Sequence, residues 1–157
     1  MNLIGKTTIN PVIFYTGKFS GYFTWITLGL AFLNVRLFNH TECCHNKIVA
    51  IVLVTIGLLF TIISLLNLGK STRLGLPSEE TVLKSNGLYK LSRNPMYVGF
   101  NLITLSSIFY TLNLWVVILG VYSIIVYHLI ILGEEKFLGN RFGNEFTRYK
   151  TKVGRYF

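Results

Sequence analysis

Long apolar stretches separated by short polar segments dominate the pattern of this chain. A helix needs about 20 mostly apolar residues to cross a lipid bilayer. Residues 19–38 reach that length, with Arg36 placed near the end, where its long side chain can extend to the membrane surface. Residues 48–68 also reach it and contain no charged residue. Residues 1–68 are therefore expected to form an N-terminal portion of two transmembrane helices.

A third apolar stretch covers residues 96–133, which is too long for one crossing. Polar side chains at residues 111–113 suit a tight turn, and they divide the stretch into spans of 96–112 and 114–133. These two spans are expected to pack as an antiparallel hairpin. The whole pattern predicts an all-α fold, a polytopic membrane helical bundle of about four transmembrane helices in a single membrane domain.

The tail that begins at Lys136 is too polar for another span. Its apolar side chains recur at steps of three or four residues, which places them on one helical face, and basic side chains lie toward the other face. The apolar members are Leu138, Phe142, Phe146, Tyr149 and Val153, and the basic members are Arg141, Arg148, Lys152 and Arg155. This pattern predicts a C-terminal amphipathic helix that lies on the membrane surface or covers a polar site.

Composition and charge support a lipid environment. The chain is 52% hydrophobic and 13% charged, about half the charged share of a soluble domain. Its net charge of +9 suits nucleic acid or anionic lipid, but the basic residues flank apolar runs, so the bilayer is the expected partner and nucleic acid is not. Of the 15 lysines and arginines, only Arg36 and Lys47 fall on the side opposite the termini. Both termini are therefore expected to be cytoplasmic.

The densest group of unusual residues occupies positions 87–99, at the start of the third span. Pro95 suits the first turn of a helix, so the span should begin there, with Arg93 just outside it. Arg93 and the backbone amides of the helix start form an anion site of the kind that a ligand carboxylate needs. Tyr97 lies one turn inside the helix, and Gly99 allows a partner helix or a ligand to approach the backbone closely. The same pattern also occurs at membrane boundaries that bind no ligand.

Glu134 and Glu135 form a second candidate at the end of the fourth span. The helix dipole and desolvation both disfavour acidic groups there, so the pair indicates a compensating partner: Arg93, Arg141 or a bound ligand. A solvated pair that interacts with Lys136 is the simpler alternative. Because the third span starts on the cytoplasmic side and the fourth returns to it, Arg93 and the two glutamates should lie at the same face. Together with aromatic side chains they could bind a zwitterionic, partly apolar ligand.

An ordered set of motifs covers residues 87–155. It consists of G-x-Y-x-x-x-R-N-P-x-Y-x-G, an apolar hairpin, E-E-x-x-L, and F-G-x-E-F-x-x-Y-x-x-x-V-x-R. This set resembles the C-terminal signature of isoprenylcysteine carboxyl methyltransferases and the related phospholipid methyltransferases. The resemblance implies a membrane-embedded methyltransferase that uses S-adenosylmethionine and acts on a lipophilic methyl acceptor, with residues 69–157 as the catalytic portion.

The resemblance also implies which residues bind the cofactor. The expected cofactor-binding residues are Tyr89, Arg93, Asn94, Pro95, Tyr97, Gly99, Glu134 and Glu135. Aromatic faces can stabilise a sulfonium cation, an arginine can pair with the carboxylate of the donor, and a glutamate can bind its amino group or ribose hydroxyls. Glu135 and Arg155 are the expected catalytic residues: Arg155 would position a carboxylate acceptor, whereas a phospholipid amine needs a glutamate to take its proton. The sequence does not choose between these acceptors.

Two other functions remain open at this level. One is an NADPH-dependent membrane reductase of the steroid-reductase type, whose C-terminal signature also resembles R-x-P-x-Y. The other is a non-catalytic membrane interaction protein on the same scaffold. The paired glutamates and the short chain favour the methyltransferase.

Histidines and cysteines elsewhere in the chain point to no metal site. Residues 40–45 contain two histidines, one glutamate and two cysteines, but adjacent cysteines do not readily reach one tetrahedral ion, so a polar loop is expected. His128, within the fourth span, is expected to be a packed, hydrogen-bonded side chain rather than a catalytic one.

Overall fold

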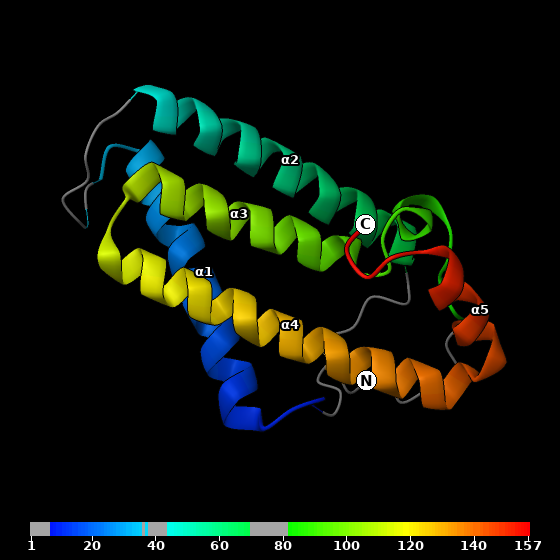
Figure 1. The fold of residues 1–157 in the computed structure, drawn as a ribbon. Coiled ribbons are helices and arrows are strands. Elements are labelled where there is room, and N and C mark those ends of the chain that lie inside the picture. The colour runs from blue at the N-terminus through cyan, green and yellow to red at the C-terminus, as the bar shows by residue number, and fades with distance from the viewer. Residues whose placement is uncertain (1–6, 36, 38–43, 70–81) are drawn as a thin grey trace.

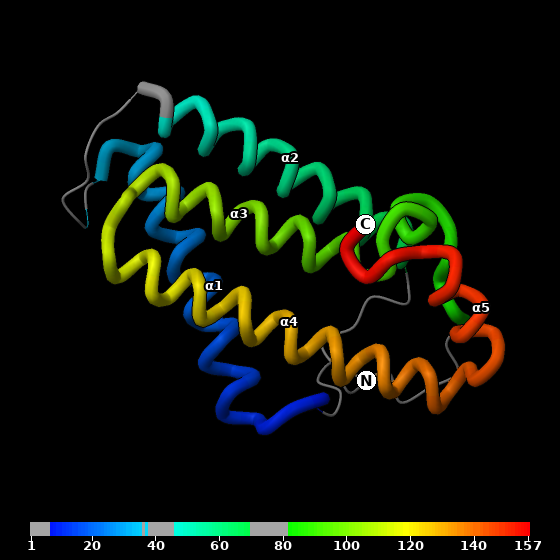
Figure 2. The backbone as a smooth tube through the Cα atoms, viewed as in Figure 1, coloured from blue at the N-terminus to red at the C-terminus, as the bar shows by residue number. Residues whose placement is uncertain are grey.

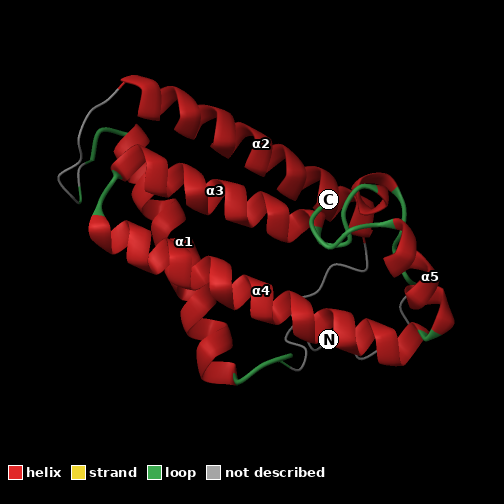
Figure 3. Cartoon of the chain, viewed as in Figure 1, coloured by secondary structure: helices red, strands yellow, loops and turns green. Residues whose placement is uncertain are grey.

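A computed structural model of the chain describes residues 7–35, 37, 44–69 and 82–157. These residues form α-helices joined by turns, and none of them is in a β-strand (Figure 3). The helices are α1 (Pro11–Phe32), α2 (Cys44–Leu68), α3 (Pro95–Thr111), α4 (Leu114–Phe142) and α5 (Asn144–Lys152), with a short 3-10 helix, η2 (Gly87–Lys90), before α3. The predicted all-α class is confirmed for the described part of the chain.

The first helix begins earlier than the sequence pattern indicated. The side chain of Asn10 accepts a hydrogen bond from the backbone N–H of Val12 at 2.9 Å, and Pro11 occupies the first helical position. This combination stabilises a helix start. Because α1 runs from Pro11 to Phe32, both bounds of the predicted span, 19 and 38, lie too late in the chain. Arg36 lies outside the described residues, as does most of the predicted polar loop at 40–45.

The helical hairpin has the predicted start and the predicted turn. Pro95 is the first residue of α3, and α3 ends at Thr111. Leu112 takes a left-handed conformation with φ 44°, which reverses the chain. The side chain of Asn113 then accepts the N–H of Trp115 at 3.0 Å and starts α4. The expected break at residues 111–113 is confirmed.

The predicted C-terminal amphipathic helix begins later than expected. Instead of ending near residue 133, α4 continues to Phe142. Gly143 then breaks the helix with φ 49° and ψ −117°, a conformation that only glycine adopts readily, and α5 follows. The apolar face predicted from Lys136 onward is thus divided between two helices, with Phe142 on α4 and Phe146 on α5.

The helices pack in two pairs. One pair is α2 with α3, the other is α1 with α4, and α3 also contacts both α1 and α4 (Figure 1). The backbones of α2 and α3 approach closely: a Cβ added to Gly99 would lie 2.6 Å from the carbonyl oxygen of Gly57. After α5 the chain turns back toward the start of α3 (Figure 2). This return places the C-terminal segment beside Arg93.

Two of the described helices are long and apolar enough to cross a membrane. These segments are Asn46–Leu68 of α2 and Leu114–Phe142 of α4. Many large apolar side chains of α2 face outward, a surface that suits lipid better than water. The exposed members on α2 are Ile48, Val49, Ile51, Val52, Ile56, Leu58, Leu59, Ile62, Ile63, Leu65 and Leu66. The count of four transmembrane helices stays a prediction.

Candidate functional site

A carboxylate held between two guanidinium groups forms the centre of the site. The Nε and Nη2 atoms of Arg93 donate to Oε1 of Glu135 at 3.1 and 2.9 Å. The corresponding atoms of Arg155 donate to Oε2 of the same glutamate at 3.1 and 2.9 Å. The start of α3, the end of α4 and the C-terminal segment therefore meet at one side chain, as the hairpin topology predicted for Arg93 and Glu135.

The two ion pairs differ in their exposure to solvent. The side chains of Arg93 and Glu135 are each 7% exposed, whereas that of Arg155 is 32% exposed. Its hydrogen bonds to Glu135 raise the pKa of Arg155 above its usual value, so this guanidinium stays charged. Two positive charges face one negative charge, which leaves an excess positive charge at the site.

Backbone hydrogen bonds fix the C-terminal segment against the start of α3. The N–H of Arg93 donates to the carbonyl oxygen of Gly154 at 3.0 Å. The hydroxyl of Ser92 and the side-chain amide of Asn94 both donate to the carbonyl oxygen of Arg155, at 3.3 and 3.2 Å. Arg155 is thus held by its backbone and its side chain together. Sequence reasoning did not identify Ser92, because nothing in the motif shows that its partner is 63 residues away.

A second contact joins α5 to η2. The hydroxyl of Tyr149 donates to the carbonyl oxygen of Tyr89. Burial raises the pKa of Tyr149 to about 12, and burial has the same effect on the pKa of Tyr89, also to about 12. Both phenols are therefore protonated at neutral pH, and Tyr149 can act as the donor.

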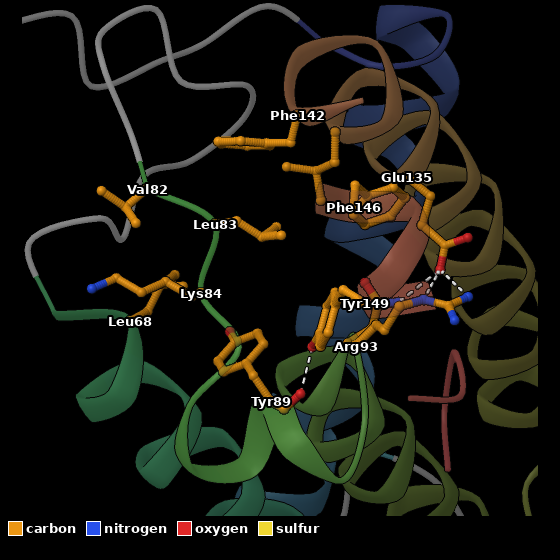
Figure 4. Close-up of a pocket in the computed structure, with 12 residues that line it drawn as sticks. Leu68, Val82, Leu83, Lys84, Tyr89, Arg93, Glu135, Phe142, Phe146 and Tyr149 are labelled. Carbon is orange, nitrogen blue, oxygen red and sulfur yellow. Dashed lines mark hydrogen bonds and ion pairs between the residues drawn. The ribbon is translucent and has the colours of Figure 1, made fainter. Parts of the chain in front are cut away.

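A cavity of about 140 Å³ lies between these elements (Figure 4). Its polar wall is formed by Tyr89, Arg93, Asn94, Glu135 and Tyr149, and its apolar wall by Leu68, Val82, Leu83, Leu138, Phe142 and Phe146. In Figure 4 the Arg93–Glu135 pair lies on one side of this space and Val82 and Lys84 lie on the other. The cavity thus combines charged groups, from the Arg93–Glu135 pair and from Lys84, with aromatic and aliphatic surface.

The two adjacent glutamates have different environments. While Glu135 binds the arginines, Glu134 accepts a hydrogen bond from the hydroxyl of Tyr97 at 2.7 Å. Lys18 of α1 interacts electrostatically with Glu134 and also lies 4.2 Å from the ring centroid of Phe14. Sequence reasoning missed Lys18, although a lysine next to an apolar helical stretch is a useful signal of a buried partner.

The remaining predicted site residues lie away from the cavity. Pro95 is fully buried at the start of α3, and Gly99 packs against α2, so neither lines the space. His128 is hydrogen-bonded through Nδ1 to the hydroxyl of Tyr156 at 2.6 Å, the packed role expected for it. Among the described residues, no three His, Cys, Asp or Glu side chains are grouped so that they could hold a metal ion.

Comparison with known proteins agrees with the resemblance seen in the motifs. A family model described as phospholipid methyltransferase matches residues 45–145. The match covers η2, α3, α4 and all of α2 except its first residue, and it includes Arg93 and both adjacent glutamates. No curated protein and no solved structure matches the chain. Because the family model covers well over half of the sequence, the chain belongs to the phospholipid methyltransferase family, a family of methyltransferases.

Proposed function

We propose that this chain is an integral membrane methyltransferase that uses S-adenosylmethionine and methylates a lipid-like acceptor. The observation that carries the proposal is the network of Arg93, Glu135 and Arg155 beside an apolar cavity. In a member of a methyltransferase family, charged groups of this kind next to lipid-facing helices suit a charged methyl donor and an apolar acceptor.

The residues present fit the chemistry of that donor. When bound, S-adenosylmethionine supplies a methyl group attached to a positively charged sulfur. The excess positive charge at the site suits the donor's carboxylate, and Arg93, held by Glu135 and by backbone carbonyls, is fixed in place to pair with it. Glu135 suits the amino group. The rings of Tyr89 and Tyr149 provide aromatic faces beside the pocket, where a desolvated cation is stabilised.

The cavity must widen to bind S-adenosylmethionine. The cavity of about 140 Å³ is smaller than the roughly 300–1,000 Å³ of typical ligand sites. Arg155 is the most exposed member of the charged network, and its contact with Glu135 is therefore the one that solvent can replace most readily. We propose that Arg155 leaves Glu135 when the donor binds and is then free to position the acceptor.

The acceptor is either a phospholipid amine or a carboxylate of the isoprenylcysteine type. An amine acceptor must lose a proton, and a carboxylate side chain can take it. Glu135 is poorly suited to this task because two guanidinium groups bind it. Glu134, which accepts only the hydroxyl of Tyr97 among the described hydrogen bonds, is the better proton acceptor. The description of the family favours the phospholipid amine.

The proposed arrangement in the membrane has four transmembrane helices with both termini on the cytoplasmic side. It is supported by the concentration of basic residues on the side of the termini. Residues 1–68 would supply two helices, and residues 69–157 would supply the catalytic portion.

Binding of S-adenosylhomocysteine to the detergent-purified chain tests the cofactor assignment. The affinity of the wild type is compared with that of Arg93→Ala and Glu135→Gln. Lys136→Gln serves as the control, because Lys136 is exposed and lies outside the charged network. The site is supported if Arg93→Ala and Glu135→Gln lose binding and Lys136→Gln keeps it. Equal affinity in all four proteins, or displacement of the ligand by NADPH, would overturn the proposal.

A further inference from the structure

A second cavity lies on the surface between the segment that leads into α3 and the outer face of α5. It measures about 370 Å³, and its polar lining comes from Ser85, Lys90, Glu145, Arg148 and Lys152, with Tyr149 between them. We call this cavity the basic groove. It is separate from the Arg93–Glu135 centre, since neither of those residues lines it.

The basic groove carries an uncompensated positive charge. Lys90, Arg148 and Lys152 line it together with one acidic residue, Glu145. All four side chains are exposed. None of the three cationic side chains forms an ion pair or a side-chain hydrogen bond with another described residue, whereas Arg93 is paired with Glu135. Three cations around a concave surface concentrate positive potential, and an arginine there can bind two phosphate oxygens at once.

The surroundings of the groove favour a lipid as the source of that phosphate. Leu83 and Tyr149 line both the basic groove and the first cavity, so the charged surface continues directly into an apolar one. The ends of α2 and α4, the two helices suited to crossing a membrane, supply Leu68 and Phe142 to that apolar wall. The groove therefore lies at the level where the headgroups of a bilayer would be, and an amphiphile matches it better than a free anion does.

We propose that the basic groove binds the phosphate group of an anionic membrane lipid. Arg148 holds the phosphate from α5, Lys152 supports it one turn later, and Lys90 closes the site from η2. Such a lipid would join η2 to α5 across the groove, next to the Tyr149–Tyr89 contact. This site goes beyond the proposed methyl transfer and does not depend on which acceptor is methylated.

Binding to short-chain lipids in detergent tests the proposal on the full chain. Dioctanoyl phosphatidic acid is the anionic probe, dioctanoyl phosphatidylcholine is the neutral one, and inorganic phosphate represents the free anion; calorimetry measures each affinity. Phosphatidic acid should bind most tightly. The double variant R148Q/K152Q should weaken it about 25-fold, since each cation near a membrane surface contributes roughly a fivefold effect. Lys90→Gln alone should weaken it about fivefold.

Controls separate this site from the cofactor site. Lys136→Gln removes one positive charge outside the groove and should change the affinity for phosphatidic acid by less than twofold. Binding of S-adenosylhomocysteine by R148Q/K152Q should equal that of the wild type, which also shows that the double variant folds. If inorganic phosphate binds as tightly as the lipid, the lipid assignment is wrong. If the groove variants bind phosphatidic acid as Lys136→Gln does, the groove is not the site.

Discussion

Replacing Glu135 by glutamine removes the negative charge from the centre of the network while nearly preserving its shape. In the wild type one carboxylate accepts four N–H groups from Arg93 and Arg155 at 2.9–3.1 Å. A glutamine offers one acceptor oxygen, and its amide group directs N–H groups at an arginine that is itself only a donor. Arg93, with 7% of its side chain exposed, is then a buried charge without a counter-charge.

The expected cost follows from that burial. Removing one partner of a buried ion pair destabilises a protein by about 3–5 kcal/mol. The partially exposed Arg155 regains water when its partner is lost, so its share is at most about 1 kcal/mol. A double-mutant cycle should therefore give a coupling free energy of about 2–4 kcal/mol between Glu135 and Arg93, and a clearly smaller one between Glu135 and Arg155.

Chemical unfolding in detergent, followed by circular dichroism, measures these energies for Glu135→Gln, Arg93→Met, Arg155→Met and the two double variants. Lys136→Gln is the matched control and should unfold like the wild type. Equal coupling energies for the two arginines, or a coupling below about 1 kcal/mol for Arg93, would refute the reasoning that burial decides the strength of these contacts.

Three other changes have defined outcomes in the same unfolding assay. Tyr149→Phe should lower the free energy of unfolding by about 1 kcal/mol at neutral pH. Because burial raises the pKa of Tyr149 to about 12 from 10.0, the stabilising contribution of this hydroxyl is complete below about pH 10 and disappears as the pH rises toward 12. A difference between wild type and variant that stays constant over this pH range would contradict the prediction. Gly99→Ala should cost about 1–3 kcal/mol, since its Cβ would overlap the backbone of α2, whereas Gly29→Ala, in open space on α1, should be neutral or stabilising. Gly143→Ala should cost about 1–3 kcal/mol through backbone strain alone, because nothing lies within 4 Å of its Cβ position; an unchanged stability would show that the break between α4 and α5 needs no glycine.

The sequence predicted the start and the turn of the hairpin well, because both depend on local chemistry. Proline favours the first position of a helix, which is where Pro95 lies, and the polar residues at 111–113 suit a turn. From these two boundaries it followed that Arg93 and Glu135 lie at the same end of the bundle, and the ion pair between them agrees with that expectation. The prediction that these groups bind a cofactor remains to be tested by the binding experiment.

Other features depended on contacts that a linear pattern does not contain. Adjacent positions on a helix point about 100° apart, so Glu134 and Glu135 could not both face Arg93. The different environments of the two glutamates were therefore foreseeable. That Glu134 interacts with Lys18 of α1 was not. The extension of α4 past its glutamates was also unforeseen. It is possible because guanidinium groups from residues 42 and 20 positions away compensate the charge of Glu135.

The hydrogen bonds of the C-terminal segment have a consequence for biosynthesis. Asn94 and the carbonyl oxygen of Arg155 are 61 residues apart in the chain, so the pocket cannot close while the ribosome is still adding the residues between them. The hairpin that carries Glu135 would enter the bilayer first, with half of its counter-charge still missing. Completion of the pocket is therefore a late event, and a defect at Ser92 or Arg155 should yield a chain that is inserted normally and assembled incompletely.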